Sequence, residues 1–526
     1  MAFKYHRYLI DFALALLSSL LLVVSFPKFD LGFLAWIGIL PLLIAINGKN
    51  IKHSLMLSFI CGMLFFLGIF QWILEIPKYT LLHHTILAVY LGTYFGLFGL
   101  FFGFISRNWG TTPTLFGAPF IWVSLEYIRS NLSFLALPWG LLGHSQYKYP
   151  LVIQIASFAG TYSISFLIVM VNCALAAIIL PSLYRSEKYV LLSKKGRKSF
   201  VIVTVSLVVF TLIYGKLITS RKIIGKEIKV SVVQGNIEQA KKWDPVYAQE
   251  IMQIYTELTQ EASKGRPVLI IWPETATPWL ITRHPLLNTG VKKIATDSQA
   301  YLLLGSAQNQ KFKKKEAERP NLFNSAFLIH PDPGVLRHQR YDKIRLFPFG
   351  EYLPYKETIP WSLINVRETI DNTPEKKFTI FDIPESRFGV TICWENIFPD
   401  LFRQFVKRGA QFMVNITNEA WFGKTAAPYQ LVSISVFRAV ENRVFIVRSA
   451  NTGISCIIDP HGRIVDRVKN GDGQEIFVRG WMSGWVIPLD SKTFYTHHGD
   501  LLVWVSLFGS LVFLSVAFWK FLSSRG

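Results

Sequence analysis

Three reactive side chains lie at or just beyond the ends of segments whose composition predicts β-strands. Glu274 ends the apolar segment VLIIWPE, and Cys393 follows the apolar segment FGVTI. Lys343 lies in the loop sequence RYDKIRLFPFGEYLP. An α/β sheet presents its catalytic groups at such strand ends and in the loops that follow them. A carboxylate can take a thiol proton and an ammonium can stabilise an oxyanion, so the three side chains could transfer an acyl group without a metal.

Cys393 is the candidate nucleophile of this set. The segment WENIFPDLFRQF after it predicts the start of a helix, where the dipole and free amides favour a thiolate and can bind an oxyanion. The alternative is a buried structural cysteine, because a lone Cys on an apolar strand often serves as a small hydrophobe. Glu274 could likewise be an ordinary loop residue and Lys343 a surface charge. The joint occurrence of the three is what favours catalysis.

Longer motifs around these residues resemble those of the carbon-nitrogen hydrolase (nitrilase) superfamily. The motifs are VVQGNI followed by KWD at 242–244, WPE at 272–274, YDKxxLxPFGEYxP at 341–354, CxE at 393–395 and NxTNEAWFG at 415–423. The resemblance implies an α-β-β-α sandwich whose triad is Glu274 as general base, Lys343 as oxyanion stabiliser and Cys393 as the residue acylated. Neither a metal nor a cofactor is expected.

The same resemblance assigns two further glutamates. Glu351, in PFGEY, matches a fourth family glutamate that supports the triad, and Glu395 matches one beside the nucleophile. The sequence departs from the family at Trp394, where the family often has Tyr. We expect the change to be tolerated, because the oxyanion donor there would be the backbone amide.

Apolar and aromatic residues crowd the loops near the triad. Trp243, Asn415, Trp421 and Phe422, with Trp394 and Glu395, are expected to bind substrate or to support the site. Other members of the apolar set are Pro278, Trp279, Phe347, Phe349, Tyr352, Trp361 and Tyr429. Some of these side chains are expected to be ordinary loop packing. The rest are predicted to line a lipid-facing entrance and an acyl-chain channel.

The remainder of the chain predicts a membrane domain. Of 526 residues, 51% are hydrophobic, which favours a membrane part joined to a globular part. Apolar runs able to cross a bilayer occur at about 8–26, 31–47, 54–74, 81–105, 113–128, 151–180, 199–219 and 500–522. The first run is long and has no small-residue cleavage site after it, so an uncleaved span is favoured over a signal peptide.

Charge sets the expected orientation of these eight spans. One set of alternate connections holds thirteen Lys and Arg residues and the other holds four, which predicts that both termini are cytoplasmic. The net charge of +21 is clustered beside apolar runs, so we interpret it as topology and attraction to anionic lipid rather than nucleic-acid binding. The predicted domains are 1–220 with seven transmembrane helices, an extracytoplasmic 221–495, and 496–526 with an eighth helix and a cytoplasmic tail.

Residues 221–495 alternate short β-branched runs with polar helical stretches, which predicts an α/β domain. Expected strands are 228–237, 268–274, 300–307, 324–330, 388–395, 412–418, 444–451 and 454–460. Expected helices are 244–264, 287–297, 397–408 and 428–442. Near-continuous apolar strands indicate sheets covered on both faces, and ANTGISCIIDPHGRIV predicts a hairpin, so mixed sheets in a layered sandwich are favoured over a parallel doubly wound fold.

The expected donor is an activated ester. The sequence has neither GxxxxGK[ST] nor a GxGxxG fingerprint after a strand, and an extracytoplasmic site has no access to ATP or acyl-CoA. A glycerophospholipid supplies such an ester, and a thiol would pass its acyl group on by a ping-pong route through a thioester.

The carbon-nitrogen hydrolase motifs together with the eight predicted spans resemble the apolipoprotein N-acyltransferase family over essentially the whole chain. That resemblance implies an acceptor, the α-amino group of the S-diacylglyceryl cysteine of an apolipoprotein, in the last step of lipoprotein maturation. It also implies a monomer in the bacterial inner membrane with a periplasmic catalytic domain.

Two alternatives remain at this point. A membrane-anchored amidase or nitrilase could hydrolyse small carbon-nitrogen bonds with the same triad. A transporter with a binding domain would instead need ionisable residues or broken helices in mid-membrane. Asp11, Glu75 and Glu126 lie near the predicted ends of spans, which disfavours the transporter.

Overall fold

The computed structural model divides into two compact units. One comprises Met1–Arg221 with His498–Gly526, and the other comprises Lys222–His497. The structure describes residues 2–77, 79–183, 194–281, 284–310, 321–335, 338–364, 366 and 371–524.

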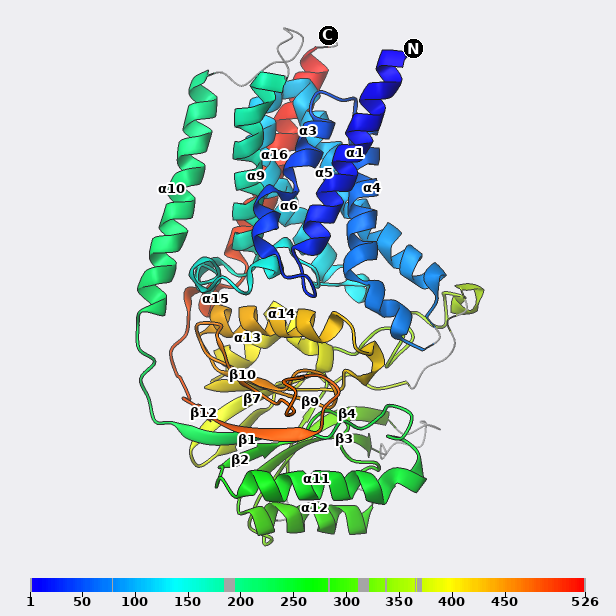
Figure 1. Cartoon of the computed structure of the whole chain (residues 1–526), viewed down its shortest axis with the longest axis vertical. Coiled ribbons are helices and arrows are strands. Elements are labelled where there is room, and N and C mark those ends of the chain that lie inside the picture. Colours follow the sequence, from blue (N-terminus) through cyan, green and yellow to red (C-terminus); the bar gives the residue numbers. More distant parts are fainter. Residues whose placement is uncertain are drawn as a thin grey trace. The chain divides into compact units, whose positions relative to one another are not determined.

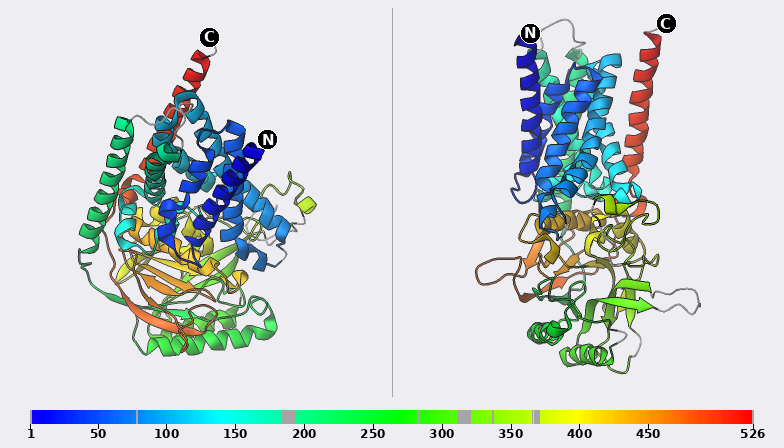
Figure 2. Two further views of the ribbon diagram at one scale, coloured as in Figure 1. Left: turned by 45° about the horizontal axis from the view of Figure 1, so that its top comes forward. Right: turned by 90° about the vertical axis from the view of Figure 1, so that its right-hand side faces the viewer.

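The first unit is built from helices (Figure 1). They are α1 (Ala2–Val24), α2 (Ala35–Gly38), α3 (Leu40–Ile46), α4 (Ile51–Ile69), α5 (Leu81–Trp109), α6 (Thr111–Asn131), α7 (Pro150–Ile153), α8 (Ala156–Ala159), α9 (Tyr162–Leu183), α10 (Lys194–Thr219) and α16 (Leu501–Ser523). Each of the eight predicted runs overlaps one or more of these helices. The first turns of α1 and the last turns of α16 lie at the same end of this unit (Figure 2).

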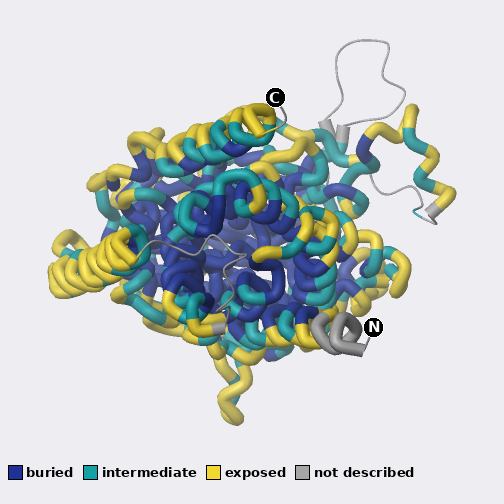
Figure 3. The backbone as a smooth tube through the Cα atoms, turned by 90° about the horizontal axis from the view of Figure 1, so that it is seen from above, coloured by how far each residue is buried: buried dark blue, intermediate teal, exposed yellow. Residues whose placement is uncertain are grey.

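Five helices in the described part of the chain are long and apolar enough to cross a membrane: α4, α5, α9, α10 and α16. Only 22% of the apolar window of α16 is buried, and the helix beside the C-terminal label in Figure 3 is largely exposed or intermediate. A helix that exposes this much apolar surface needs an apolar solvent. The protein is therefore a membrane protein, and the count of eight spans stays a prediction.

Small residues let the helices of this unit approach closely. A Cβ added to Gly99 on α5 would lie 2.3 Å from the carbonyl oxygen of Ser54 on α4, so only glycine fits there. Arg129 is a buried charge that finds hydrogen-bond partners within the unit. Arg129 donates to the carbonyl oxygens of Leu137 and Trp139 at 2.9 and 2.8 Å, and these bonds fix the chain that follows α6.

The second unit contains two six-stranded sheets with the orders β12-β1-β2-β3-β4-β5 and β11-β10-β9-β8-β7-β6. The strands of the first sheet are β1 (Ile228–Gln234), β2 (Leu269–Ile271), β3 (Tyr301–Gln310), β4 (Asn321–Ile329), β5 (Gln339–Asp342) and β12 (Gly480–Val486). Those of the second are β6 (Ile380–Ile383), β7 (Ser386–Ile392), β8 (Phe412–Thr417), β9 (Ile446–Ala450), β10 (Cys456–Ile458) and β11 (Ile464–Arg467). The helices are α11 (Ala248–Ser263), α12 (Pro285–Ser298), α13 (Pro399–Lys407), α14 (Ala427–Asn442) and α15 (Phe494–His498).

Both sheets are mixed and share one pairing pattern. In each, two adjacent parallel pairings, β1-β2-β3 or β7-β8-β9, are flanked by antiparallel ones. Helices α11 and α12 cover the first sheet and α13 and α14 cover the second (Figure 1). The predicted polytopic α-helical membrane domain and α-β-β-α sandwich are confirmed.

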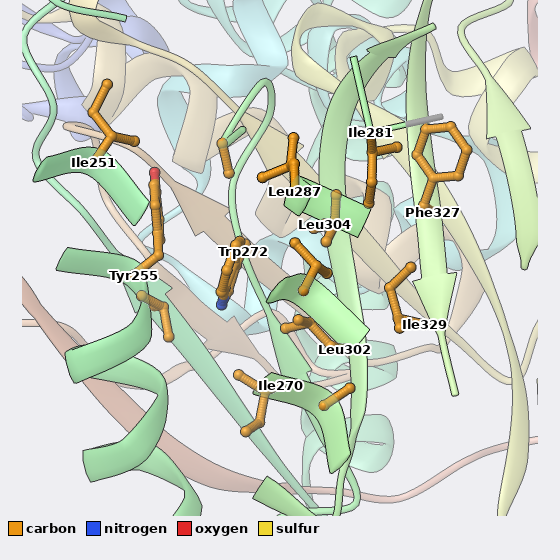
Figure 4. Packing of buried hydrophobic residues seen from close by; sticks show 14 of the residues in the cluster. Ile251, Tyr255, Ile270, Trp272, Ile281, Leu287, Leu302, Leu304, Phe327 and Ile329 are labelled. Atoms are coloured by element: carbon orange, nitrogen blue, oxygen red, sulfur yellow. The ribbon is translucent and has the colours of Figure 1, made fainter. Parts of the chain in front are cut away.

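The core beneath α11 and α12 fixes the strand end that carries Glu274. Trp272 is fully buried and stacks on Tyr255 with ring centroids 4.8 Å apart, and its Nε1 donates to Thr259 Oγ1 at 2.8 Å (Figure 4). Tyr255 and Thr259 both lie on α11, so the end of β2 is anchored to this helix. The residues that follow Trp272, including Glu274, are therefore held in a fixed position.

Most predicted elements are present within a few residues of their expected bounds, and the hairpin is confirmed as antiparallel β9-β10-β11. Strands β5, β6 and β12 had no sequence prediction. They are short or lie at sheet edges, and β12 pairs with β1, to which it is distant in sequence, through partners such as Ile228 and Val486. β5 and β6 have only four residues each, which is too short to show a clear alternation of apolar and polar residues.

Candidate active site

Glu274 follows β2 on a tightly packed turn. Thr275 has φ +45°, a left-handed conformation that a non-glycine residue adopts only where its surroundings compel it. Gly305 on β3 permits the turn, because a Cβ there would lie 2.6 Å from the Cα of Glu274. The Glu274 carboxylate accepts from Asn324 Nδ2 at 2.7 Å and from the backbone N–H of Asn418 at 2.8 Å.

Lys343 follows β5 and points at two carboxylates. Its Nζ lies 2.9 Å from Glu351 Oε2 and 3.6 Å from Glu274 Oε1, and its side chain is 1% exposed. Burial alone would lower the pKa of Lys343, but the carboxylates of Glu351 and Glu274 outweigh it and hold the pKa above its ordinary value. The side chain is therefore a fixed cation at neutral pH.

Glu351 links the two groups just described. Its carboxylate binds Lys343, accepts from the backbone N–H of Phe347 at 2.7 Å, and accepts from Asn324 Nδ2 at 2.9 Å. Asn324 thus donates to both Glu274 and Glu351 through one amide nitrogen. The structure brings all four predicted catalytic residues into one cluster, because the charges of Glu274, Lys343 and Glu351 also act on the thiol of Cys393.

Cys393 stands directly after β7 with φ +54°, and it begins the 3-10 helix η7 (Cys393–Ile397). Its residue stays partly accessible. Burial of the thiol, together with the negative charge of Glu274, raises the pKa of Cys393 well above its ordinary value, and Lys343 offsets this only in part. Burial and Glu274 thus oppose the thiolate that the helix terminus is predicted to favour. The thiol is protonated and needs a base.

Neutral amides and a buried ion pair hold the backbone of the cysteine. Asn415 Nδ2 donates to the carbonyl oxygens of Cys393 and Thr391 at 3.2 and 3.1 Å. Arg448 Nη1 donates to Asn415 Oδ1 at 2.7 Å, and its other nitrogen pairs with Glu419. Asn415 therefore supports the strained turn, and Arg448 orients Asn415.

Glu395 joins the cysteine loop to the lysine loop. Its carboxylate accepts from Tyr341 Oη at 2.8 Å and from the backbone N–H groups of Ile344, Arg345 and Ile392 at 2.7, 3.0 and 2.8 Å. Burial raises the pKa of Glu395, against the opposing effects of Lys343 and of these donors.

Trp394 also joins the two loops. Its side chain is buried, and its Nε1 donates to the carbonyl oxygen of Arg345 at 2.7 Å. The ring of Phe347 packs edge-on against it, with centroids 4.9 Å apart. Trp394 thus holds the loop that follows Lys343 against the loop that carries Cys393.

The remaining predicted residues lie at the outer loops. Trp243 and Trp421 are 51% and 42% exposed, whereas Phe422 is buried. Phe349 and Trp361 pack edge-on with centroids 4.9 Å apart, which fits ordinary loop packing. No hydrogen bond in the described part of the chain joins Trp243 or Trp421 to the triad, and the lipid-facing entrance stays a prediction.

Several residues of the site had no sequence prediction. Asn324 opens the segment NSAFLIH, Lys242 and Asn418 lie inside quoted motifs, and Arg448 lies in the predicted strand VFIVRSAN. An asparagine or arginine on an otherwise apolar strand is a signal in itself, because a buried polar side chain needs a partner. No set of three metal-ligating side chains clusters anywhere in the described residues, and all four cysteines are free.

A carboxylate, an ammonium and a thiol at strand ends of an α-β-β-α sandwich define the class of carbon-nitrogen hydrolases, and the carbon-nitrogen hydrolase family model matches residues 229–478. The model of the apolipoprotein N-acyltransferase N-terminal domain matches residues 18–174. The chain is 36% identical to apolipoprotein N-acyltransferase of Geobacter metallireducens, covering 97% of this chain and 95% of the relative. It is 30% identical to that of Chlorobaculum tepidum, covering 94% of each.

The chain therefore belongs to the apolipoprotein N-acyltransferase family, and it is a membrane-bound acyltransferase of lipoprotein maturation. Among solved structures, it is similar to Nit3 of Saccharomyces cerevisiae, a member of branch 10 of the nitrilase superfamily. That similarity has a TM-score of 0.37 and 20% identity, and it covers 51% of this chain and 93% of the other.

Proposed function

We propose that Cys393 carries the acyl group as a thioester, with Glu274 as general base and Lys343 as the cation that stabilises the oxyanion. The observation that supports this most directly is the convergence of the three groups. Lys343 Nζ lies 3.6 Å from Glu274 Oε1, and the charges of both act on the Cys393 thiol. Glu351 and Glu395 position these groups.

The first half-reaction acylates the enzyme. Glu274 takes the proton as Cys393 Sγ attacks the ester carbonyl carbon, which yields a tetrahedral oxyanion held by Lys343. Collapse of the oxyanion breaks the bond to the alcohol oxygen, which leaves with the proton from Glu274. The thioester remains and Glu274 is again ionised. The raised pKa of Cys393 supports general-base attack over attack by a preformed thiolate.

The donor that fits this chemistry is a glycerophospholipid, and the alcohol released is a lysophospholipid. A membrane-bound enzyme meets this ester in its own surroundings, and the sequence contains no nucleotide-binding motif. The exposed rings of Trp243 and Trp421 are suited to an interface, because aromatic side chains favour the headgroup region. They form part of the proposed entrance for the acyl chain.

The proposed acceptor is the α-amino group of the S-diacylglyceryl cysteine of an apolipoprotein. The amine attacks the thioester, Glu274 takes a proton from the resulting tetrahedral intermediate, and the departing Cys393 sulfur receives that proton. An amide is formed and the enzyme is restored. The names of the relatives support this acceptor.

The proposed setting is the bacterial inner membrane, with eight spans and both chain termini in the cytoplasm. Residues 221–495 would then be periplasmic, and the protein would act as a monomer. The excess of Lys and Arg in one set of connections supports this orientation. The common end of α1 and α16 in the helical unit is consistent with it (Figure 2).

Trapping the acyl-enzyme tests the proposal. After incubation with a palmitoyl phospholipid and no acceptor, intact-protein and peptide mass spectrometry should find one palmitoyl adduct on Cys393. Cys456, which is buried, is the internal control and should stay unmodified. Cys393→Ala should abolish both the adduct and lysophospholipid release while membrane insertion persists. Cys393→Ser with activity near wild type would contradict a thiol nucleophile.

A further inference from the structure

Lys242 is a buried amine beside the reacting groups, and the mechanism above gives it no role. Its residue is 3% exposed. Its Nζ donates to the backbone carbonyl oxygen of Glu274 at 3.0 Å and to Thr275 Oγ1 at 2.9 Å. Both acceptors are uncharged, and no carboxylate of the described residues forms an ion pair with this nitrogen.

The hydrogen bonds of Lys242 match those of a neutral amine. A neutral amine has two N–H bonds and one lone pair, and the two acceptors account for both N–H bonds. An ammonium has a third N–H, which would lack a partner in this buried place. The geometry therefore favours the form that can accept a proton.

The charged group that faces Lys242 is the Glu274 carboxylate beyond β2, and the Cys393 thiol beyond β7 is a second titratable group that acts on it when ionised. Burial lowers the pKa of Lys242 to about 7, although the negative charge of Glu274 opposes the shift. A substantial fraction of the side chain is thus neutral at physiological pH. The side chain also contacts the turn that carries Glu274, through the Glu274 carbonyl oxygen and Thr275 Oγ1.

The acceptor loses two protons in the second half-reaction, and Glu274 takes only one of them. An α-amino group has a pKa of about 8, so the acceptor arrives mainly as an ammonium ion. It loses one proton before it can attack and a second after it has attacked. Glu274 takes the second and returns it to the departing sulfur of Cys393. The first proton needs another base.

We infer that Lys242 is this base, and that it takes the first proton from the acceptor ammonium directly or through one water. An N–H bond of the ammonium breaks and leaves its electron pair on the acceptor nitrogen, and the lone pair of Lys242 Nζ forms the new N–H bond. The acceptor amine then attacks the thioester carbonyl, and the C–S bond breaks as described. Lys242 later returns its proton to solvent. This role rests on the proposed thioester mechanism.

A purely positioning role makes a different prediction. Lys242 also holds the turn of Glu274, and Glu274 serves both half-reactions, so a loss of positioning would slow both alike. A loss of the base would slow mainly transfer to the amine. Arginine retains N–H donors but stays protonated, so Lys242→Arg separates donation from proton acceptance.

The test measures the two half-reactions separately in lipid-detergent micelles. Thioester formation is followed with palmitoyl phosphatidylethanolamine, and transfer is followed in a single turnover after adding a diacylated lipopeptide. We expect Lys242→Met and Lys242→Arg to slow transfer about 100-fold at pH 7 and thioester formation by less than about tenfold. Transfer by both variants should recover as the pH rises toward about 9, because the acceptor amine then loses its own proton.

The matched control is Lys241→Met, which removes a neighbouring lysine that lies over the ring of Tyr247 at 5.1 Å and should behave as wild type. The inference would be overturned if Lys242→Arg transferred the acyl group at the wild-type rate, if the variants slowed both half-reactions equally, or if transfer did not recover at high pH. Failure of the wild-type protein to form a thioester on Cys393 would instead refute the proposed function, so the two failures are distinguishable.

Discussion

The two sheets of the globular unit share one pattern of strand pairing but hold their functional side chains by different means. The first sheet carries Glu274 and Lys343 beyond β2 and β5, and Glu351 follows in the same loop as Lys343. The Lys343 ammonium offsets part of the charge of the two carboxylates, and Asn324 on β4 of the same sheet donates to both of them. The acid-base groups therefore form a network that one sheet completes largely by itself.

The second sheet carries a neutral thiol in a strained turn. Cys393 is held through Asn415, and Asn415 is held by Arg448, whose charge is matched by Glu419 behind the turn. The backbone N–H of Asn418, which follows β8 of the second sheet, donates to Glu274 of the first sheet. In the proposed mechanism the thiol proton also passes from the second sheet to the first. The first sheet therefore supplies the acid-base groups and the second holds the thiol in position, and the proposed reaction begins when a proton passes from that thiol to Glu274.

The largest expected effect comes from removing the base on the first sheet. Glu274→Gln keeps the hydrogen-bonding shape but cannot take the proton of a thiol whose pKa is raised, so thioester formation should fall about 10³-fold. Rapid-quench measurement of the adduct on Cys393 checks this. Glu357→Gln, at an exposed carboxylate, is the control. A Glu274→Gln rate within tenfold of wild type would mean that the thiol ionises without this base.

The next effect concerns the ion pair behind the second sheet. Arg448 and Glu419 are 1% and 0% exposed, so Arg448→Met leaves a buried carboxylate unpaired and should destabilise the protein by about 3–5 kcal/mol. Thermal unfolding of the detergent-solubilised protein measures this. Arg448→Met with Glu419→Gln should restore much of the loss.

The exposed pair Arg467–Glu475 provides the matched comparison, because its arginine is 33% exposed. Arg467→Met should cost about 1 kcal/mol or less. Equal losses of stability for Arg448→Met and Arg467→Met would contradict the proposal that the buried ion pair supports the turn of Cys393.

The smallest effect belongs to the outer loop that follows β8. Trp421 is 42% exposed, and its truncation to alanine should weaken contact with the lipid donor by about 1 kcal/mol, or about fivefold in KM, with little change in stability. Trp485→Ala, at a ring 54% exposed on β12, should leave KM unchanged. If both variants behave alike, Trp421 is not part of the entrance.

Much of the fold and the chemical identity of the site could be predicted from the sequence alone. Glu274, Lys343 and Cys393 each lie in a contiguous motif, and Glu274 and Cys393 lie at the ends of apolar strands, where such folds present reactive groups. The alternation of apolar and polar residues is local information, as is the length of an apolar run, so the sandwich and the membrane helices were predictable.

Only the tertiary structure decided how these groups behave. The raised pKa of Cys393, the lowered pKa of Lys242 and the two hydrogen bonds that Asn324 donates depend on burial and on neighbours distant in the chain. The pairing of the edge strand β12 with the distant strand β1 likewise depends on the fold, whereas β5 and β6 pair with neighbours in the chain but are too short to carry a clear pattern of their own. Residue types determine which reactions are possible, whereas the desolvation and charge around them determine where each proton resides.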